Sequence, residues 1–402
     1  RLSAKMEGVL ARAATAVSHR EGAALGAALE TCTRPDEQLL SVLRAGSVDV
    51  GEACARALPE PYDEIFACRL RATAASERRE FAEAYAQQEG CLSAFHKVFQ
   101  EAGADWLLPA LHVVDRGVRK LALQADAHLR AQGAKADKLQ EAARVLNRSF
   151  TITITDRAPL ESSKKWGALA VINELFKVYF KLNNLRLCTN LIRAVDGTGF
   201  PPFDDFPMSQ KVAYKYYVGR LSMLNANFQL AEEQLMYAFD HCPRTSLKNK
   251  RLCLLYLVPT RLVLGRFASG RLLDKYALAH FRPLCAAVSV GDLRAFNEHK
   301  DAHQSLYIQQ GIYLIVERAK TVVYRNLFKR MHALMGTNKM SLRQMSAALG
   351  AAGVPTDIDE LECILANLIY QNYVKGYISH QKRFLVVSAK EPFPALSAVP
   401  AQ

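Results

Sequence analysis

The chain has 402 residues, of which 50% are hydrophobic and 23% are charged. This composition allows a sizeable buried core and differs from that of disordered or membrane-embedded chains. The best apolar run, residues 252–264, contains Pro259 and Arg261 and is too short to cross a bilayer. The formal net charge of +13 favours acidic partners, and no membrane partner is expected.

Nine cysteines lie far apart in the sequence, and none forms a CxxC pair. An odd, scattered set among apolar residues predicts reduced core thiols, as in a cytosolic or nuclear protein. Residues 1–10 lack the apolar stretch of a secretory signal. The cysteines are Cys32, Cys54, Cys68, Cys91, Cys188, Cys242, Cys253, Cys285 and Cys363.

Residues 1 to about 150 are rich in alanine and have apolar residues at helical spacing, which predicts an array of antiparallel helical hairpins. Residues 151–155 (TITIT) alternate like a strand. Because a lone strand among helices has no partner, we expect the tertiary context to override this propensity. Residues 166–192 have a broad apolar helical stripe, and the glycine- and proline-rich residues 197–207 favour a break between lobes.

A degenerate tetratricopeptide-like unit follows this loop. Small residues at its spacing let two helices approach closely, and a proline ends the second helix. The unit therefore predicts stacked helix pairs, which residues 252–280 and 307–335 continue. The residues that match are Gly219, Phe228, Ala231, Leu235, Ala238 and Pro243.

Residues 341–388 have the element order of a winged helix. Ser341 with Gln344 predicts a capping box that opens one helix, and Asp357 with Glu360 predicts the start of a second. After Gly376, two strand-like segments flank a polar tip at residues 380–382. The predicted fold is an all-α helical repeat, a TPR-like α-solenoid, that ends in a winged-helix subdomain.

Basic residues concentrate in the last part of the chain, where residues 318–356 contain no carboxylate. They are open to two interpretations, a set of solvated helix faces or a surface for phosphates. Because the second winged-helix helix begins with acidic residues, sequence-specific reading of a duplex is not expected. The candidate residues for contacts with RNA or DNA without sequence specificity are Arg325, Lys329, Arg330, Lys339, Arg343, Lys375, Lys382 and Arg383.

No motif predicts catalysis or a cofactor. His299 and His303 share a predicted helix face, but no third metal ligand is evident, so a solvated polar surface is the better interpretation. Neither a phosphate loop nor a GxSxG motif is present. We therefore expect a protein that is not an enzyme.

Several long runs resemble one known family. They include SKKWG (163–167), LFKVYFKLN (175–183), YKYYVGR (214–220), TVVYRNLFKR (321–330), DIDELECILANLIY (357–370) and VKGYISHQ (374–381). These runs lie in the same order along the chain as in the PCI-domain family, and they resemble that family, and within it the Thp-one type of mRNA-export subunit, over most of residues 160–390. Residues 1–150 match less clearly.

The resemblance implies a subunit of the nuclear TREX-two complex, associated indirectly with the nuclear pore, with shuttling to the cytoplasm left open. It implies a Sac-three type scaffold, a small acidic disordered partner of the Sem-one type, and RNA or DNA. The basic stretch 244–275 suits the acidic partner, and the residues expected to bind partners are Lys248, Lys250, Arg251, Tyr370 and Tyr373.

The expected domains are residues 1–205, a helical lobe; 206–336, the helical part of the PCI domain; 337–390, the winged helix; and 391–402, a tail. A structural PCI subunit of another assembly is the alternative, such as the proteasome lid, the signalosome or an initiation factor, without nucleic-acid contact.

Overall fold

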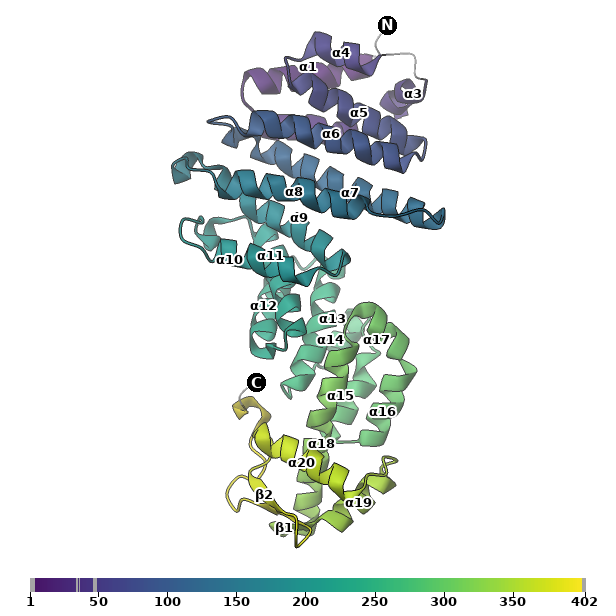
Figure 1. Cartoon of the computed structure of the whole chain (residues 1–402), viewed down its shortest axis with the longest axis vertical. Helices are drawn as coiled ribbons and strands as arrows, with labels where there is room; N and C mark the ends of the chain where they lie inside the picture. The colour runs from purple at the N-terminus through teal and green to yellow at the C-terminus, as the bar shows by residue number, and fades with distance from the viewer. Residues whose placement is uncertain (1–3, 34, 36, 46–48, 400–402) are drawn as a thin grey trace. The chain divides into compact units, whose positions relative to one another are not determined.

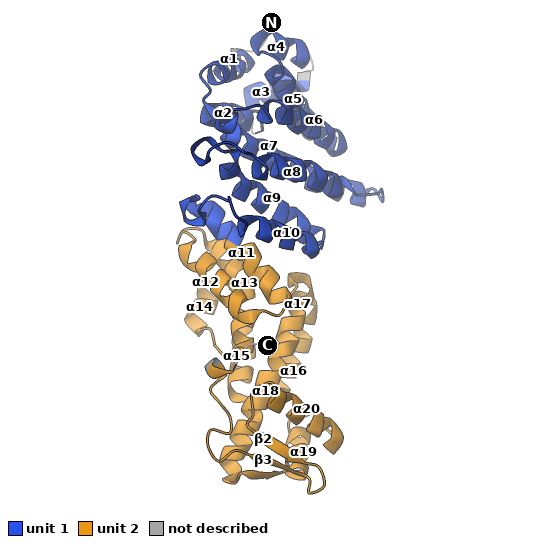
Figure 2. Ribbon diagram, turned by 60° about the vertical axis from the view of Figure 1, so that its left-hand side comes forward, with its two compact units in different colours: residues 1–214 blue, residues 215–402 orange. Residues whose placement is uncertain are grey.

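The computed structural model describes residues 4–33, 35, 37–45 and 49–399. The chain divides into two compact units, residues 1–214 and 215–402 (Figure 2). The division falls inside helix α11 (Met208–Leu224), shortly after the loop in which the sequence predicted a break.

Unit 1 consists of helices that pack on their neighbours in sequence, with α5 on α6, α6 on α7 and α8 on α9 (Figure 1). Its residues 151–154 are helical, so the tertiary context does override the strand-like TITIT pattern. The helices are α1 (Ala4–Ser18), α2 (Gly22–Thr33), α3 (Glu37–Ala45), α4 (Val50–Ala57), α5 (Tyr62–Glu77), α6 (Phe81–Phe99), α7 (Leu108–Ala131), α8 (Lys138–Ile154), α9 (Ala168–Lys181) and α10 (Leu185–Val195).

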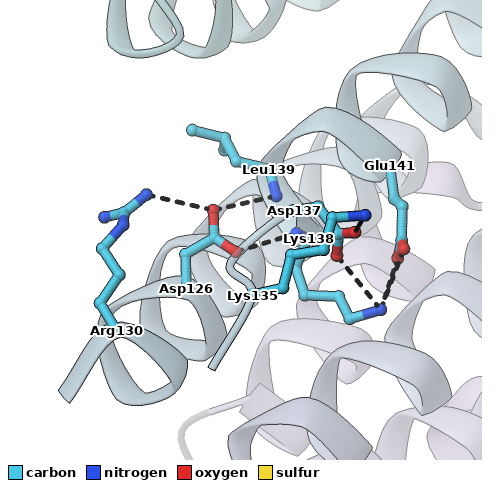
Figure 3. A network of polar contacts seen from close by, with 7 residues as sticks. All are labelled: Asp126, Arg130, Lys135, Asp137, Lys138, Leu139 and Glu141. Carbon is cyan, nitrogen blue, oxygen red and sulfur yellow. Dashed lines mark hydrogen bonds and ion pairs between the residues drawn. The ribbon is translucent and has the colours of Figure 1, made fainter. Parts of the chain in front are cut away.

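A buried carboxylate of α7 caps the start of α8. Asp126 is 2% exposed and accepts hydrogen bonds from the backbone N–H groups of Lys138, at 2.9 Å, and Leu139, at 3.3 Å (Figure 3). Arg130 lies 3.6 Å from the same carboxylate. The first N–H groups of a helix have no partner within that helix, so Asp126 satisfies them and fixes the turn between α7 and α8.

The loop at residues 197–207 is packed within unit 1. Phe206 is 2% exposed, and the centroid of its ring lies 5.3 Å from that of Trp166 and 5.5 Å from that of Phe200. Lys165 Nζ donates to the carbonyl of Gly199 at 2.9 Å. The packing of these buried aromatic rings and the hydrogen bond from Lys165 fix the position of the loop within unit 1.

Unit 2 continues the helical repeat. A Cβ at Gly219 would lie 2.7 Å from Cγ of Leu235, so the glycine of the predicted repeat does permit a close helix approach. Beyond α11, the helices are α12 (Phe228–His241), α13 (Leu247–Val263), α14 (Gly270–Lys275), α15 (Phe281–Val290), α16 (Leu293–Ala302), α17 (Gln304–Gln310) and α18 (Tyr313–Met335).

The winged helix follows α18. It contains β1 (Lys339–Ser341), α19 (Leu342–Ala351), α20 (Ile358–Tyr370), β2 (Gly376–Ser379) and β3 (Phe384–Val387), with strand order β1-β3-β2 and both pairs antiparallel. The Asp357 side chain caps α20 by accepting from the N–H of Glu360 at 2.7 Å. Ser341 is the N-cap residue of α19, as predicted, but its side chain makes no capping hydrogen bond, so the predicted capping box is wrong.

The winged helix and the helical part of unit 2 share one continuous hydrophobic core. Leu365 of α20 and Leu385 of β3 are fully buried, as are Val316 and Phe328 of α18. Residues 391–396 close this core, since Phe393 is 7% exposed and Lys375 N–H donates to the carbonyl of Pro392 at 2.9 Å. The subdomain is therefore held against α18 by its core.

Candidate nucleic-acid interface

The strands of the winged helix present one face to solvent. Met340 and Leu385 pair across β1 and β3 and are fully buried, so the alternate residues of these strands point outward. On that side Val386 pairs with both Lys339 of β1 and Tyr377 of β2. This outer sheet face comprises Lys339, Ser341, Tyr377, Ser379, Phe384 and Val386.

The outer sheet face carries aromatic side chains and no carboxylate. Tyr377 is 62% exposed and Phe384 is 37% exposed, and they occupy diagonal positions on adjacent strands. Diagonal neighbours in a sheet lie about 7–8 Å apart. Two exposed rings at this spacing beside a lysine are suited to stacking on unpaired bases while the lysine meets a phosphate.

Several predicted cations are exposed and have no ion-pair partner among the described residues. They are Lys329 on α18, Lys339 in β1, Arg343 in the first turn of α19 and Lys382 at the tip of the wing. Arg330 is also exposed, but its Nη1 donates to the carbonyl of Val290 at 2.9 Å. These positions can neutralise phosphates without reading bases.

The other basic residues of the wing face carboxylates. Arg383 Nη1 lies 3.7 Å from Asp359 Oδ1, and His380 Nδ1 lies 2.7 Å from Glu362 Oε2, so the wing tip leans on the acidic start of α20. Lys375 Nζ pairs with Glu391 at 2.7 Å. The wing therefore compensates part of its own charge.

Arg325 is removed from the predicted interface because it is only 4% exposed. Its Nη2 donates to the carbonyls of Phe393 at 3.1 Å and Pro394 at 2.6 Å, and its Nη1 donates to Asn326 Oδ1 at 2.8 Å. A phosphate cannot reach this guanidinium. Arg325 instead ties residues 393–394 to α18, which local sequence could not reveal.

In the basic stretch 244–275, contacts within the chain likewise reduce the number of cations that are available to a partner. Lys250, expected to bind a partner, is 6% exposed and donates to the carbonyl of Phe239 at 2.5 Å. Arg261 and Arg266 both pair with Glu232. Lys248 stays exposed beside two exposed leucines, Leu247 and Leu252, while Arg251 is half-buried. An exposed mixture of basic and apolar groups suits an acidic chain with apolar residues.

The two tyrosines expected at a partner surface differ. Tyr370, at the end of α20, is 72% exposed. Tyr373 is half-buried, and burial raises the pKa of its hydroxyl. Tyr370 is therefore the accessible one, whereas Tyr373 packs against the core of unit 2. Strand β1 was not predicted, since a three-residue strand leaves little sequence pattern. Phe384 lies in a strand that the sequence did predict, but it was not among the predicted interface residues.

The buried cysteines fit the prediction of core thiols, with two exceptions. Cys68 is half-buried and Cys363 is exposed on α20. In the part of the chain that the structure describes, no three His, Cys, Asp or Glu side chains are arranged to hold a metal. His299 Nε2 lies 3.1 Å from the hydroxyl of Tyr307, and its ring stacks on His303.

None of the described helices combines the length and the apolar character needed to cross a membrane.

A helical repeat whose core continues into a winged helix defines the class of PCI-domain proteins. The PCI domain family matches residues 297–389. PCI domain-containing protein 2 of Xenopus laevis is 44% identical over 353 residues, or 87% of this chain and 88% of that protein. The Danio rerio protein of that name is 43% identical over the same shares, and its Dictyostelium discoideum homolog is 40% identical over 87% and 82%.

The chain belongs to the PCI domain-containing protein 2 family, which confirms the predicted family and fold class. It is accordingly a PCI-domain subunit of a protein complex.

Proposed function

We propose that this chain is a non-catalytic subunit of the nuclear TREX-two complex, in which it couples RNA binding to mRNA export at the nuclear pore. It docks a Sac-three type scaffold and contributes a basic winged-helix surface to RNA or DNA. The family membership supports this proposal, because its relatives match along most of the chain.

The observation that carries the nucleic-acid part of the proposal is the outer sheet face. Tyr377 and Phe384 are exposed there without a neighbouring carboxylate on the same face, and Lys339 lies in the same cross-strand row as Tyr377. An aromatic platform beside cations favours single strands, because stacking tolerates any base and phosphate contacts carry no sequence information.

The small acidic partner of the complex would lie along the start of α13. Lys248 and Arg251 provide charge, and the exposed Leu247 and Leu252 provide apolar contacts on the same two turns. Replacing Leu247 and Lys248 by glutamate is expected to release such a partner. Unchanged copurification of an acidic protein would contradict this part of the proposal.

The complex is tested by mass spectrometry of proteins that copurify with the tagged chain from nuclease-treated nuclear extract. A Sac-three type scaffold and a small acidic protein in comparable amounts are expected. Recovery of proteasome-lid, signalosome or initiation-factor subunits instead would assign the chain to another PCI assembly and overturn the export function.

The nucleic-acid surface is tested by fluorescence anisotropy with a single-stranded RNA at several salt concentrations. Each cation in contact with a phosphate of a single strand contributes about −0.7 to the slope of log K against log salt. If Lys329, Lys339, Arg343 and Lys382 all make such contacts, the slope is expected to be about −3. Y377A with F384A should weaken binding by about tenfold or more without changing this slope, since stacking contributes about 1–3 kcal/mol per base. The control is L334A, which alters another exposed apolar residue of unit 2. Equal affinities for the double variant and the control would refute the interface.

A further inference from the structure

Two serines lie on either side of an exposed aromatic ring on the outer sheet face. Phe384 of β3 pairs with Ser341 of β1 on one side and with Ser379 of β2 on the other. Residues that lie directly opposite each other in a sheet point to the same side of it. In the adjacent row of this face, Tyr377 pairs with Val386, whose side chain has no polar group. Phe384 is therefore the exposed ring that has a hydroxyl group on each side.

Neither of these hydroxyl groups has a hydrogen-bond partner among the described residues. Ser341 is the N-cap residue of α19, where a serine hydroxyl usually accepts from an N–H of the first turn, but its side chain makes no such hydrogen bond. The two remaining serines of the winged helix, Ser346 and Ser388, donate to backbone carbonyls at 2.6 Å and 2.9 Å. Because Ser341 and Ser379 are partly exposed, their hydroxyl groups are available to a ligand.

The backbone brings Ser341 close to Phe384. The N–H of Leu342 donates to the carbonyl of Arg383 at 3.0 Å, so the adjacent pair Ser341 and Phe384 has no hydrogen bonds between its own backbone groups. The Cα atoms of such a pair lie about 4.5 Å apart, against about 5.5 Å in a hydrogen-bonded pair. The Ser341 side chain therefore lies within reach of the sugar of a nucleotide whose base stacks on Phe384.

The exposed cations favour a path for the sugar–phosphate backbone along the Ser341 side of the ring. With the strand order β1-β3-β2, β1 forms one edge of the sheet. Lys339 and Arg343 flank Ser341 in the sequence, and both are exposed without an ion-pair partner among the described residues. A strand whose phosphates meet these two cations passes Ser341 with its bases directed over β3.

The Ser379 side of the ring is less favourable for phosphates. Of the basic residues at the wing tip, Arg383 and His380 face carboxylates of α20. Lys382 is the one wing-tip cation without an ion-pair partner among the described residues. Ser379 therefore offers the same chemical group as Ser341 on the side where less positive charge is available.

We propose that Ser341 makes the outer sheet face prefer single-stranded RNA to single-stranded DNA, by hydrogen bonding to the 2′-hydroxyl of the nucleotide whose base stacks on Phe384. This inference rests on the proposed nucleic-acid function of the face. Stacking on Phe384 and the phosphate contact of Lys339 do not distinguish the two strands, because both strands have bases and phosphates. The 2′-hydroxyl both donates and accepts hydrogen bonds, as a serine hydroxyl does, and deoxyribose lacks it.

Fluorescence anisotropy of the full chain with three single strands of one sequence tests the assignment. The strands are RNA, DNA with uracil in place of thymine, and RNA with 2′-fluoro groups, which keep a ribose-like sugar pucker but cannot donate a hydrogen bond. We expect RNA to bind about three- to tenfold more tightly than DNA, the effect of one hydrogen bond between neutral groups. The 2′-fluoro strand should bind about as weakly as DNA.

Variants of the two serines then locate the source of the preference. S341A should reduce the affinity for RNA to that for DNA and leave the affinity for DNA unchanged. S341T keeps the hydroxyl group and should retain the preference. S379A is the matched control, because it removes the same group from the other side of Phe384, and it should also retain the preference. Since Ser341 makes no capping hydrogen bond, S341A is expected to fold as the wild type does.

Four results would overturn the role of Ser341. They are equal affinities of the wild type for RNA and DNA, an unchanged preference in S341A, a loss of preference in S379A as large as in S341A, and a 2′-fluoro strand that binds as tightly as RNA. In each case the nucleic-acid surface itself stands if Y377A with F384A still weakens binding. If the wild-type chain binds neither RNA nor DNA, the proposed nucleic-acid function fails, and the preference assigned to Ser341 fails with it.

Discussion

Arg325 and Lys329 lie one turn apart on α18, and substitution of each should affect a different property of the protein: stability for Arg325 and RNA binding for Lys329. Arg325 is buried and holds the carbonyls of Phe393 and Pro394, whereas Lys329 is exposed without an ion-pair partner among the described residues. R325M is expected to destabilise unit 2 and leave the outer sheet face intact. K329M is expected to weaken RNA binding and leave stability unchanged.

The loss in R325M follows from its contacts. A hydrogen bond from a charged donor contributes about 1.5–3 kcal/mol, and two of them hold the backbone of residues 393–394. The methionine keeps most of the apolar stem, so packing changes little. Removing the guanidinium also removes its desolvation cost, which places the net loss at about 2–4 kcal/mol. K329M, at a surface position, should stay within about 0.5 kcal/mol.

Hydrogen exchange locates the effect of R325M more sharply than a global melt. The N–H of Lys375 donates to the carbonyl of Pro392. When residues 392–394 detach, this amide should exchange faster, together with those of residues 388–393. Urea unfolding measures the accompanying loss of stability, and anisotropy with single-stranded RNA measures binding.

An R325M protein with unchanged urea unfolding and hydrogen exchange but reduced RNA affinity would contradict the structural role of Arg325. That result would mean that Arg325 reaches phosphate after all. For K329M, the slope of log K against log salt should fall by about 0.7, the share of one phosphate contact with a single strand.

Three further predictions concern stability. D126A removes the cap of α8 and should lower the free energy of unfolding by about 1–2 kcal/mol in thermal melts, with Q140A, at an exposed position of the same helix, as the surface control; equal melting of the two variants would contradict the capping role. L365D buries an unpaired charge and should expose the winged helix to proteolysis, whereas A366D, at the exposed neighbouring position, should resist; a protease-resistant L365D would show that the core is misassigned. Burial lowers the pKa of His96 to about 4, so the folded state holds this ring neutral, and stability should fall by roughly 2–3 kcal/mol as pH drops from 6.5 to about 4. The same fall in H96Q, measured by urea unfolding at both pH values, would exclude His96 as its source.

The architecture of unit 2 could be predicted because its signals are local. Asp357 marks the start of α20, and the spacing of Leu361, Leu365 and Leu368 gives one apolar face, which is fully or almost fully buried. The role of Gly219 could be predicted only from the spacing of a known repeat, but the need for a small residue at this position comes from a single neighbouring helix, α12. Helices and hairpins of this kind depend on contacts between residues close in sequence.

The interface residues could only partly be predicted, because accessibility depends on distant contacts. Arg325 meets carbonyls 68 and 69 residues away, and Lys250 reaches a carbonyl of the preceding helix. A basic residue on a helix has the same local pattern whether its side chain is buried or exposed. Phe384 was overlooked for a related reason, since its outward direction follows from the register of β3 with β1 and β2.

The charge of the wing also depends on tertiary contacts. In the sequence, the acidic residues Asp359 and Glu362 argue against base reading by α20. In the structure, Asp359 also lies beside Arg383 of the wing tip, and Glu362 lies beside His380. A phosphate that approaches the tip must compete with these carboxylates, whereas Lys339 and Lys382 have no such competitor among the described residues. The attractive surface is therefore narrower than the net charge of +13 suggests, and it is centred on the outer sheet face. D359N should consequently strengthen RNA binding by releasing Arg383, and unchanged affinity in that variant would mean that the wing tip does not meet the strand.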